Sequence, residues 1–465
     1  MNMLLESKLS LARAAGAVSR RIGRGGTSLP GKVLIALQPD AISRLSARLG
    51  RGSVIVSATN GKTTTAAMVA AVLERAGIPL VHNRAGANMA GGVASALLAS
   101  ARDGDPEAEL GLFEVDEFWL DRIAPQVRPQ ALLLGNLFRD QLDRYGELET
   151  IADRWATVVA GLGDTSALVL NADDPLIADL GRDRENVSYF GIEDETVAIA
   201  EMQHASDSKH CRRCGAAYVY DAIYLGHLGR YHCPDCGAGR PQPAVAAEQI
   251  TLDGTRGASF ILRCPAGEAR VRLPLPGLYN IYNALGAAAL CLRLSIDLDA
   301  VVAGLQGVQP AFGRAASVRV GQTELKLLLV KNPAGANEII RTLALEPGEL
   351  DLLAILNDRT ADGRDISWVW DADFEVLVGH LRRVTCAGTR AAELAVRLKY
   401  AGVPVERLHV QPHLPAALQE AVGSSGSSGP LFVLPTYTAL LELQSLLASE
   451  GHAQRFWEAT PEPVS

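Results

Sequence analysis

The segment from Ser57 to Thr65, with the sequence SATNGKTTT, contains the residue types that bind nucleotide phosphates. It follows an apolar run at residues 54–56 that predicts a short buried strand, and it opens an apolar pattern typical of a helix. Such a strand, loop and helix start surround an anion with backbone N–H groups and the positive end of a helix dipole. The residues expected to bind the nucleotide phosphates here are Asn60, Gly61, Lys62, Thr63 and Thr64.

Two side chains in this loop have specific expected roles. Lys62 would reach the terminal phosphates and act in catalysis, and the Thr63 hydroxyl would ligate magnesium. The glycine that usually stands five positions before Gly61 is replaced by Val56, so this is a shorter variant of the phosphate loop. The alternative, an ordinary turn between a strand and a helix, is less consistent with the run of hydroxyl residues after the lysine.

Four of the seven cysteines form a metal-binding pattern. Cys211 and Cys214 make one Cys-x-x-Cys pair, and Cys233 and Cys236 make a second pair after 18 intervening residues. Four thiolates at this spacing converge on zinc, whereas two unrelated redox pairs would not need it. Because four thiolates leave no open coordination position, we expect a structural zinc ribbon inserted at about residues 205–240.

Composition limits the class of protein. The chain has 465 residues, of which 48% are hydrophobic and 21% charged, so it should form two or three domains with a sizeable core. A net charge of −8 argues against a nucleic-acid binder, and the cysteine usage is typical of a reducing, cytoplasmic compartment. No apolar run reaches the roughly 18 residues of a membrane span. The arginine-containing residues 1–24 predict an amphipathic helix that packs on the body or touches a membrane surface.

Apolar runs alternate with helical patterns along most of the chain, which predicts an α/β fold. The expected organisation is a helical segment at residues 1–49, an ATP-binding domain at 50–312 that carries the ribbon, and a C-terminal α/β domain at 313–465. Extended segments were expected around the ribbon, including residues 196–200. Strands are predicted at 54–56, 110–113, 131–134, 167–170, 325–330, 352–356, 383–386 and 431–434, and a long helix is predicted at 280–294.

Several segments together resemble the Mur ligase family. The phosphate loop is similar to that of Mur ligases and folylpolyglutamate synthases, with Ala58 in place of their first glycine. The combination of a Mur-like core with a four-cysteine insert resembles the MurT group, the ligase-like subunits of lipid II isoglutaminyl synthases. The other matching segments are NRAGAN at 83–88, FEVDE at 113–117, NLFRDQLDRYG at 136–146, LNADD at 170–174 and PGLYNIYN at 276–283.

This resemblance implies a reaction. ATP would phosphorylate the α-carboxylate of D-glutamate in the stem peptide of lipid II, and ammonia would displace the phosphate to give D-isoglutamine. The ammonia would come from a separate glutaminase subunit, GatD, and the enzyme would act in peptidoglycan synthesis at the inner face of the plasma membrane. Cys264, Cys291 and Cys386 lack the surroundings of a catalytic nucleophile, which fits a division of labour with a partner.

The resemblance also implies site residues. Glu114, at the end of an apolar strand, matches the magnesium-binding glutamate of Mur ligases, with Asp116 and Glu117 as supporting acids. Arg314 matches an arginine near their domain junction and could stabilise phosphate charge. The further positions that resemble nucleotide contacts are Asn171, Asp173, Asn280 and Asn283, although asparagine at a helix start also serves as a cap.

Three departures from ordinary Mur ligases favour ammonia over an amino acid as the acceptor. A histidine metal ligand is missing from residues 140–143, and no lysine occurs between Lys62 and Lys209 to be carbamylated. The usual C-terminal acceptor motif is reduced to LLVKNP at residues 328–333.

The C-terminal domain has its own acidic segment at residues 357–371, after a predicted strand, and such positions form sites in open α/β sheets. We expect Asp365 or Asp371 to assist catalysis, either where ammonia is received or across the interface with the glutaminase. The alternative is a loop that only orients domains.

Two other functions remain open at this point. The chain could be a ligase that acts alone on a folate or an amino acid, or an ATP-binding zinc-ribbon module that regulates or binds nucleic acid. The four-thiolate insert and the missing lysine disfavour the first, and the acidic balance disfavours the second.

Overall fold

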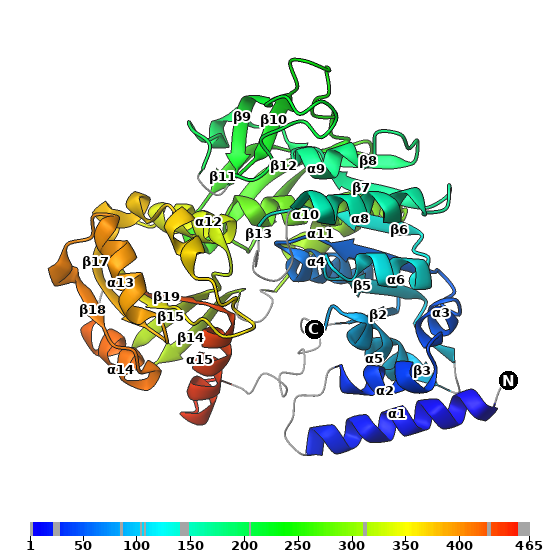
Figure 1. Ribbon diagram of the computed structural model, residues 1–465, viewed down its shortest axis with the longest axis horizontal. Helices are drawn as coiled ribbons and strands as arrows, with labels where there is room; N and C mark the ends of the chain where they lie inside the picture. The colour runs from blue at the N-terminus through cyan, green and yellow to red at the C-terminus, as the bar shows by residue number, and fades with distance from the viewer. Residues whose placement is uncertain are drawn as a thin grey trace.

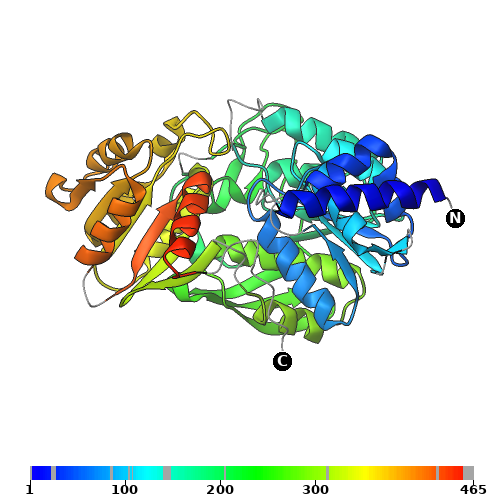
Figure 2. The ribbon, with the colours of Figure 1, turned by 90° about the horizontal axis from the view of Figure 1, so that it is seen from below.

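The computed structural model describes residues 3–21, 28–83, 87–102, 105–106, 108–139, 148–203, 206–309, 314–425 and 429–453. It has a central domain with a nine-stranded sheet and a C-terminal domain with a six-stranded sheet. The two domains lie side by side (Figures 1 and 2). The predicted α/β class, with a Mur-like centre and a C-terminal α/β domain, is confirmed.

The central sheet has the strand order β13-β12-β11-β8-β7-β6-β1-β5-β2. The six strands from β11 to β5 and the edge strand β2 pair in parallel, whereas β12 and β13 are antiparallel. The strands are β1 Ser53–Ser57, β2 Leu80–His82, β5 Leu110–Glu114, β6 Ala131–Leu134, β7 Ala167–Asn171, β8 Val187–Ile192, β11 Val245–Leu252, β12 Ala258–Cys264 and β13 Gly267–Leu273. A two-stranded ribbon joins β3 Ala101–Arg102 to β4 Asp105–Pro106.

Helices cover both faces of this sheet, and each face has its own apolar core. One core contains α4 Lys62–Arg75, α10 Leu278–Arg293 and α11 Leu298–Gln306. The other contains α1 Met3–Arg21, α2 Leu29–Leu37, α3 Ala41–Ser46, α5 Ala90–Ser100, α6 Leu120–Val127, α8 Leu148–Ala160 and α9 Pro175–Asp179. Leu9 and Ala12 of α1 are fully buried in this second core, so the first helix packs on the body.

The cysteine-rich insert forms a hairpin of β9 Val219–Leu225 and β10 Leu228–His232, at the top of Figure 1. The extended segment expected at residues 196–200 is confirmed only in part. The 3-10 turn η1 Glu195–Val197 covers its start, whereas Ala198 is extended and Ile199 forms a β-bridge with Ile223. The Asp194 carboxylate caps this turn by accepting a hydrogen bond from the Thr196 N–H at 2.9 Å. A second short turn, η2 Gly254–Arg256, joins β11 to β12.

The C-terminal sheet has the order β14-β15-β19-β16-β17-β18, parallel except for β14 at one edge. The face that carries α12 and α13 forms one core, and the face that carries α14 and α15 forms another. The strands are β14 Arg314–Val320, β15 Thr323–Leu328, β16 Leu350–Ile355, β17 Leu381–Ala387, β18 Leu408–Val410 and β19 Leu431–Pro435. The helices and turns are α12 Pro333–Ala344, η3 Ser367–Asp371, η4 Phe374–His380, α13 Ala391–Tyr400, η5 Val405–Arg407, α14 Leu414–Ser424 and α15 Tyr437–Ser449.

Parallel pairing decides where functional side chains gather. The strand β1 lies between β5 and β6, with Val56 opposite Glu114 and Ser57 opposite Leu134. Because the carboxyl ends of parallel strands meet at one edge, the loops that follow β1, β5 and β6 converge there.

Candidate active site

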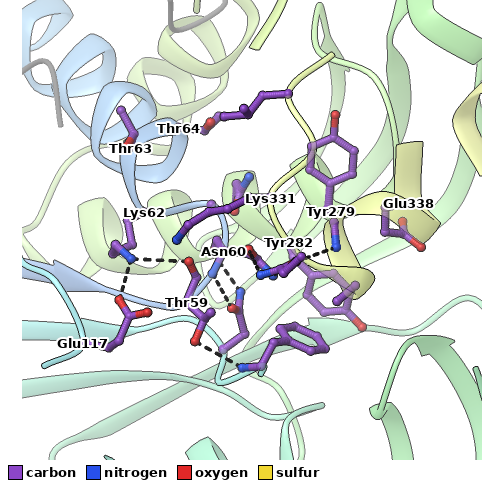
Figure 3. Close-up of a pocket in the computed structure, with 18 of the residues that line it drawn as sticks. Thr59, Asn60, Lys62, Thr63, Thr64, Glu117, Tyr279, Tyr282, Lys331 and Glu338 are labelled. Atoms are coloured by element: carbon purple, nitrogen blue, oxygen red, sulfur yellow. Dashed lines mark hydrogen bonds and ion pairs between the residues drawn. The ribbon is translucent and has the colours of Figure 1, made fainter. Parts of the chain in front are cut away.

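A cavity of about 480 Å³ opens at this edge, between the central and C-terminal domains. The loop at residues 59–64 forms its floor, and the start of α10 and the start of α12 form two walls. Figure 3 shows Lys62 and Glu117 on one side of the cavity and Tyr279 and Glu338 on the other.

The phosphate loop needs glycine at position 61. Gly61 has a φ of +85°, which is unfavourable for other residues. A β-carbon at this position would lie 2.0 Å from Asn283 Oδ1. The close approach brings the start of α10 against the loop, and the Thr65 hydroxyl donates to the same Asn283 oxygen at 3.2 Å.

The amide of Asn136, just after β6, holds the loop backbone in place. Its Oδ1 accepts from the Asn60 N–H at 2.9 Å, and its Nδ2 donates to the Asn60 carbonyl at 3.0 Å. The Thr59 hydroxyl accepts from the Phe138 N–H at 3.1 Å. These bonds fix the loop before any ligand binds, so little ordering is required on binding.

Lys62 is only 6% exposed and already has an anionic partner. Its Nζ lies 2.6 Å from Glu117 Oε2 and 3.3 Å from the Thr59 carbonyl. A buried cation needs a counter-ion, and the carboxylate fills that role when no phosphate is present. Glu117, predicted as a supporting acid, therefore acts on the lysine, and the indole of Trp155 fixes it by donating to its backbone carbonyl at 2.9 Å.

Glu114 is 1% exposed and faces the cavity at the end of β5. Its Oε1 accepts from the Thr63 hydroxyl at 3.0 Å and from Asn88 Nδ2 at 3.3 Å. Its other oxygen, Oε2, is buried without a hydrogen-bond partner among the described residues. A carboxylate and a hydroxyl beside a phosphate loop are the ligand types that magnesium takes, so these residues fit the ion predicted there. Asp116, half-buried, also lines the cavity.

The four asparagine and aspartate positions expected to contact nucleotide fall in two places. Asn280 and Asn283 line the cavity, joined by a hydrogen bond of 3.0 Å between their side chains. Asn171 and Asp173 are fully buried behind it and do not line it. Asp173 instead accepts from Arg240 Nε at 2.5 Å and from the Tyr282 hydroxyl at 2.7 Å. It therefore supports Tyr282, which does line the cavity.

The C-terminal domain supplies cavity residues that sequence reasoning missed. Asn332 exchanges hydrogen bonds of 3.0 and 3.4 Å with the Asn60 side chain, and it caps α12 by accepting from Gly335 N–H at 2.9 Å. Lys331 and Glu338 also line the cavity (Figure 3). The Asn-Pro pair at 332–333 is a helix-start signal that could have located this wall. The side chain of Arg314 and residues 140–143 lie outside the described part of the chain.

Burial raises the pKa of the Glu338 carboxyl above its ordinary value, while the nearby Arg341 acts in the opposite direction. Arg341 Nη1 lies 2.9 Å from Glu338 Oε1.

Asp365 and Asp371 are on the surface near the junction and do not line the cavity. Asp365 accepts from the Ser367 N–H at 2.8 Å, and this bond lowers the pKa of the carboxyl. Asp371 Oδ2 lies 3.7 Å from Arg139 Nη2 of the central domain. Beside them, Trp370 and Tyr400 are 53% and 73% exposed, with ring centroids 6.0 Å apart.

The four cysteines of the insert come together as predicted, with their sulfur atoms all within 4.8 Å of one another. Cys211 and Cys236 lie 3.6 Å apart, and Cys214 and Cys233 lie 3.4 Å apart. Although burial opposes it, backbone N–H groups of Arg213 and Cys214 lower the pKa of the Cys211 thiol to about 6. Four converging sulfurs, of which at least one favours the thiolate, fit a zinc ion.

Comparison with known proteins decides the family. The Mur ligase middle domain matches residues 56–233, and the MurT ligase C-terminal domain matches residues 329–440. The MurT subunit of lipid II isoglutaminyl synthase from Streptococcus pneumoniae is 31% identical over 97% of this chain and 98% of that protein. The Staphylococcus aureus MurT subunit is 32% identical over 93% and 95%. The chain belongs to the MurT family. The predicted resemblance and enzyme class, a ligase, are confirmed.

Solved structures show the same fold outside the MurT family. A pseudomurein peptide ligase type C from Methanothermus fervidus aligns with a TM-score of 0.67 at 22% identity, over 87% of this chain and 80% of that one. The MurF ligase from Thermotoga maritima in complex with ADP aligns with a TM-score of 0.64 at 14% identity, over 91% and 84%. Within the described residues, none of the helices has the length and apolarity needed to cross a membrane.

The cysteine cluster predicts one bound zinc for each chain. Replacing Cys236 by serine should remove the metal and lower the melting temperature by about 5 °C or more, because a structural zinc stabilises its fold. Native mass spectrometry with thermal unfolding would measure both effects. Cys264→Ser, outside the cluster, should keep the zinc. The assignment would be contradicted if the wild-type protein contained no zinc and the Cys236→Ser variant had the same melting temperature as the wild type.

The unpartnered oxygen of Glu114 predicts a magnesium ligand. Glu114→Gln removes the negative charge but keeps the shape, so the apparent affinity for magnesium in the presence of ATP should fall about tenfold or more. Calorimetric titration of magnesium into protein and ATP would measure it. The matched control is Glu268→Gln, an exposed residue of β13 that does not line the cavity. Equal magnesium affinities in the two variants would refute the role.

Proposed function

We propose that this MurT-family chain amidates the D-glutamate α-carboxylate of lipid II, with ATP as the energy source and ammonia as the nucleophile. The observation that carries the proposal is a single cavity with a buried lysine in its phosphate loop and a buried, half-satisfied carboxylate beside it. The identity of the pneumococcal and staphylococcal relatives, which are subunits of lipid II isoglutaminyl synthase, supports this substrate.

The reaction must bring a carboxylate and a triphosphate into contact, so its barrier is lowered mainly by positioning and charge. One carboxylate oxygen bonds to the γ-phosphorus while the bond to the bridging oxygen breaks, which yields an acyl phosphate and ADP. Ammonia nitrogen then bonds to the acyl carbon, phosphate leaves with the C–O electron pair, and nitrogen loses one proton to give the amide. Lys62 and the N–H groups of the loop would hold the phosphate oxygens throughout.

Magnesium held by Thr63 and Glu114 would supply further neutralisation of phosphate charge. Other residues of the chain position the loop and the cavity walls. Asn136 keeps the loop rigid, and Asn332 ties the C-terminal wall to Asn60, which keeps the two halves of the cavity together around the reacting groups.

We also propose that ammonia comes from a separate glutaminase of the GatD type. The relatives are named as subunits of a glutamine-hydrolysing enzyme. All three cysteines outside the cluster are buried, and burial raises the pKa of Cys291 above its ordinary value and that of Cys386 to about 12, which opposes thiolate chemistry. The exposed Trp370 and Tyr400, next to Asp371, form an apolar patch of the kind that a partner subunit covers.

A lipid-linked substrate would place the enzyme at the inner face of the plasma membrane. No role in nucleic-acid binding is proposed, because the net charge of −8 would weaken contact with a polyanion.

Lys62→Ala should abolish amidation, because it removes the buried charge that meets the terminal phosphates. Mass spectrometry of lipid II, after incubation with ATP, glutamine and both subunits, would show the amide as product. Arg75→Ala, at the exposed end of the same helix, should retain full activity. Normal amidation by Lys62→Ala would overturn the proposed function. Glutamine-dependent amidation by the isolated chain would instead favour a ligase that acts alone.

Asp365→Asn and Asp371→Asn should lower glutamine-dependent amidation about 100-fold or more while ATP affinity changes less than about twofold. Supplying ammonium salt separates the two expected roles, because it restores amidation if the residue serves the partner and not if it serves the ligase site. Asp299→Asn, exposed on α11, is the matched control. Full glutamine-dependent activity in both variants would remove these aspartates from the mechanism.

A further inference from the structure

The ribbon hairpin reaches from the cysteine cluster to the cavity. The cysteines lie just outside the two strands, before Val219 and after His232. At the opposite end, the tip at residues 225–228 joins the strands, and its Leu225 and Leu228 side chains line the cavity. The insert is thus part of the site wall and not a separate surface module.

The tip contacts the phosphate loop indirectly, through Phe138. A β-carbon on Gly226, at a φ of +57°, would lie 2.8 Å from the Phe138 ring, so glycine permits this contact. The His227 ring lies 4.7 Å from the Phe138 ring, centroid to centroid. Phe138 in turn donates its N–H to Thr59 of the phosphate loop. The position of the tip and the position of the loop are therefore linked by packing.

The C-terminal domain holds the same hairpin from the other side. Arg341 of α12 donates to the Tyr224 carbonyl at 2.7 Å, one residue before the tip. The same guanidinium nitrogen pairs with Glu338, which lines the cavity. The central domain adds a hydrogen bond of 2.9 Å from the Gly229 N–H to the Asp173 carbonyl. Contacts on both flanks leave the tip little freedom to move.

The cavity has two chemically different ends. Acidic side chains, Glu114 and Glu117, lie at one end beside Lys62, where the triphosphate and its cation would sit. Tyr279 and Tyr282 lie toward the other end, together with Glu338 (Figure 3). The tip leucines and Phe138 also line the cavity. A nucleotide that places its phosphates on the loop would direct its base away from Glu114 and Glu117. The flat faces of an aromatic base suit the tyrosine and leucine side chains elsewhere in the cavity.

We propose that the ribbon tip, through Leu225 and Leu228, is a surface on which the base of ATP packs, and that the cysteine cluster holds this tip in position. The inference rests on the proposed function, because it assumes that ATP phosphates occupy the loop. It assigns the insert a role in positioning the nucleotide of this family's reaction.

The test compares two probes, ATP and inorganic tripolyphosphate, in calorimetric titrations with the full chain in magnesium. Tripolyphosphate fills the phosphate loop but has no base. Leu225→Ala and Leu228→Ala should weaken ATP about tenfold, since each removes a buried leucine contact, and should leave tripolyphosphate affinity unchanged. Val219→Ala, exposed at the cysteine end of the same hairpin, should leave both unchanged. Cys236→Ser should weaken ATP selectively in the same way.

The outcomes separate this inference from the proposed function. If both leucine variants bind ATP as tightly as the wild-type protein does, the base-packing role alone is overturned. Equal weakening of ATP and tripolyphosphate would also overturn it, because the tip would then support the loop and not the base. Failure of wild-type protein to bind either probe would overturn the proposed function and this inference together. Melting temperatures measured on each variant exclude loss of folded protein as the cause.

Discussion

The buried ion pair between Lys62 and Glu117 is the interaction on which the rest of the site depends. Both side chains are almost fully removed from water, and their charged atoms lie 2.6 Å apart. Breaking such a pair without a replacement would strand a buried charge, which is costly. In the proposed function, a triphosphate replaces the carboxylate as partner of the lysine, and the ion pair holds the Lys62 side chain in place beforehand. Trp155, from α8, keeps Glu117 at that distance through its backbone.

The cavity exists only because the two domains meet, and three polar contacts join them around it. Asn60 and Asn332 bond at the floor, Arg341 and Tyr224 bond at the ribbon wall, and Arg139 pairs with Asp371 near the rim. These contacts come from three different loops or elements of the central domain, so they fix both separation and rotation. Polar contacts of this kind are weak enough to break individually, which suits a site that must admit substrate and release product.

Much of this arrangement was predictable from the sequence, and the reasons differ by feature. The phosphate loop and the cysteine pairs are local patterns, in which spacing alone fixes geometry, so Lys62 and the sulfur cluster were found directly. Buried strands such as β5 and β6 are short apolar runs with clear ends, so Glu114 was also placed at the sheet edge. Residues such as Glu338 and Leu228 could not be found, because they enter the cavity through tertiary packing of distant segments.

Asp173 shows the limit of arguing from a motif. Its position after β7 places it at the correct edge of the sheet, as the resemblance suggested. Its carboxylate, however, points into a buried network with Arg240 and Tyr282, and burial raises its pKa while Arg240 opposes that change. A sequence pattern fixes the edge of a sheet that a residue occupies, but neighbouring layers decide whether its side chain reaches the ligand or supports a residue that does.

In the proposed function, the balance of charge in the cavity favours a nucleotide that is accompanied by a cation. Among the described lining residues, two are lysines, Lys62 and Lys331, and four are carboxylates. A triphosphate entering such a cavity would be repelled unless further positive charge came with it. The unpartnered oxygen of Glu114 lies where that charge is needed, beside Thr63 and the phosphate loop. In the proposed function, the acidic surplus would disfavour a nucleotide without its metal and would couple occupation of the two sites. Lys331 comes from the C-terminal domain, so part of the positive charge is present only when that domain is seated against the central one.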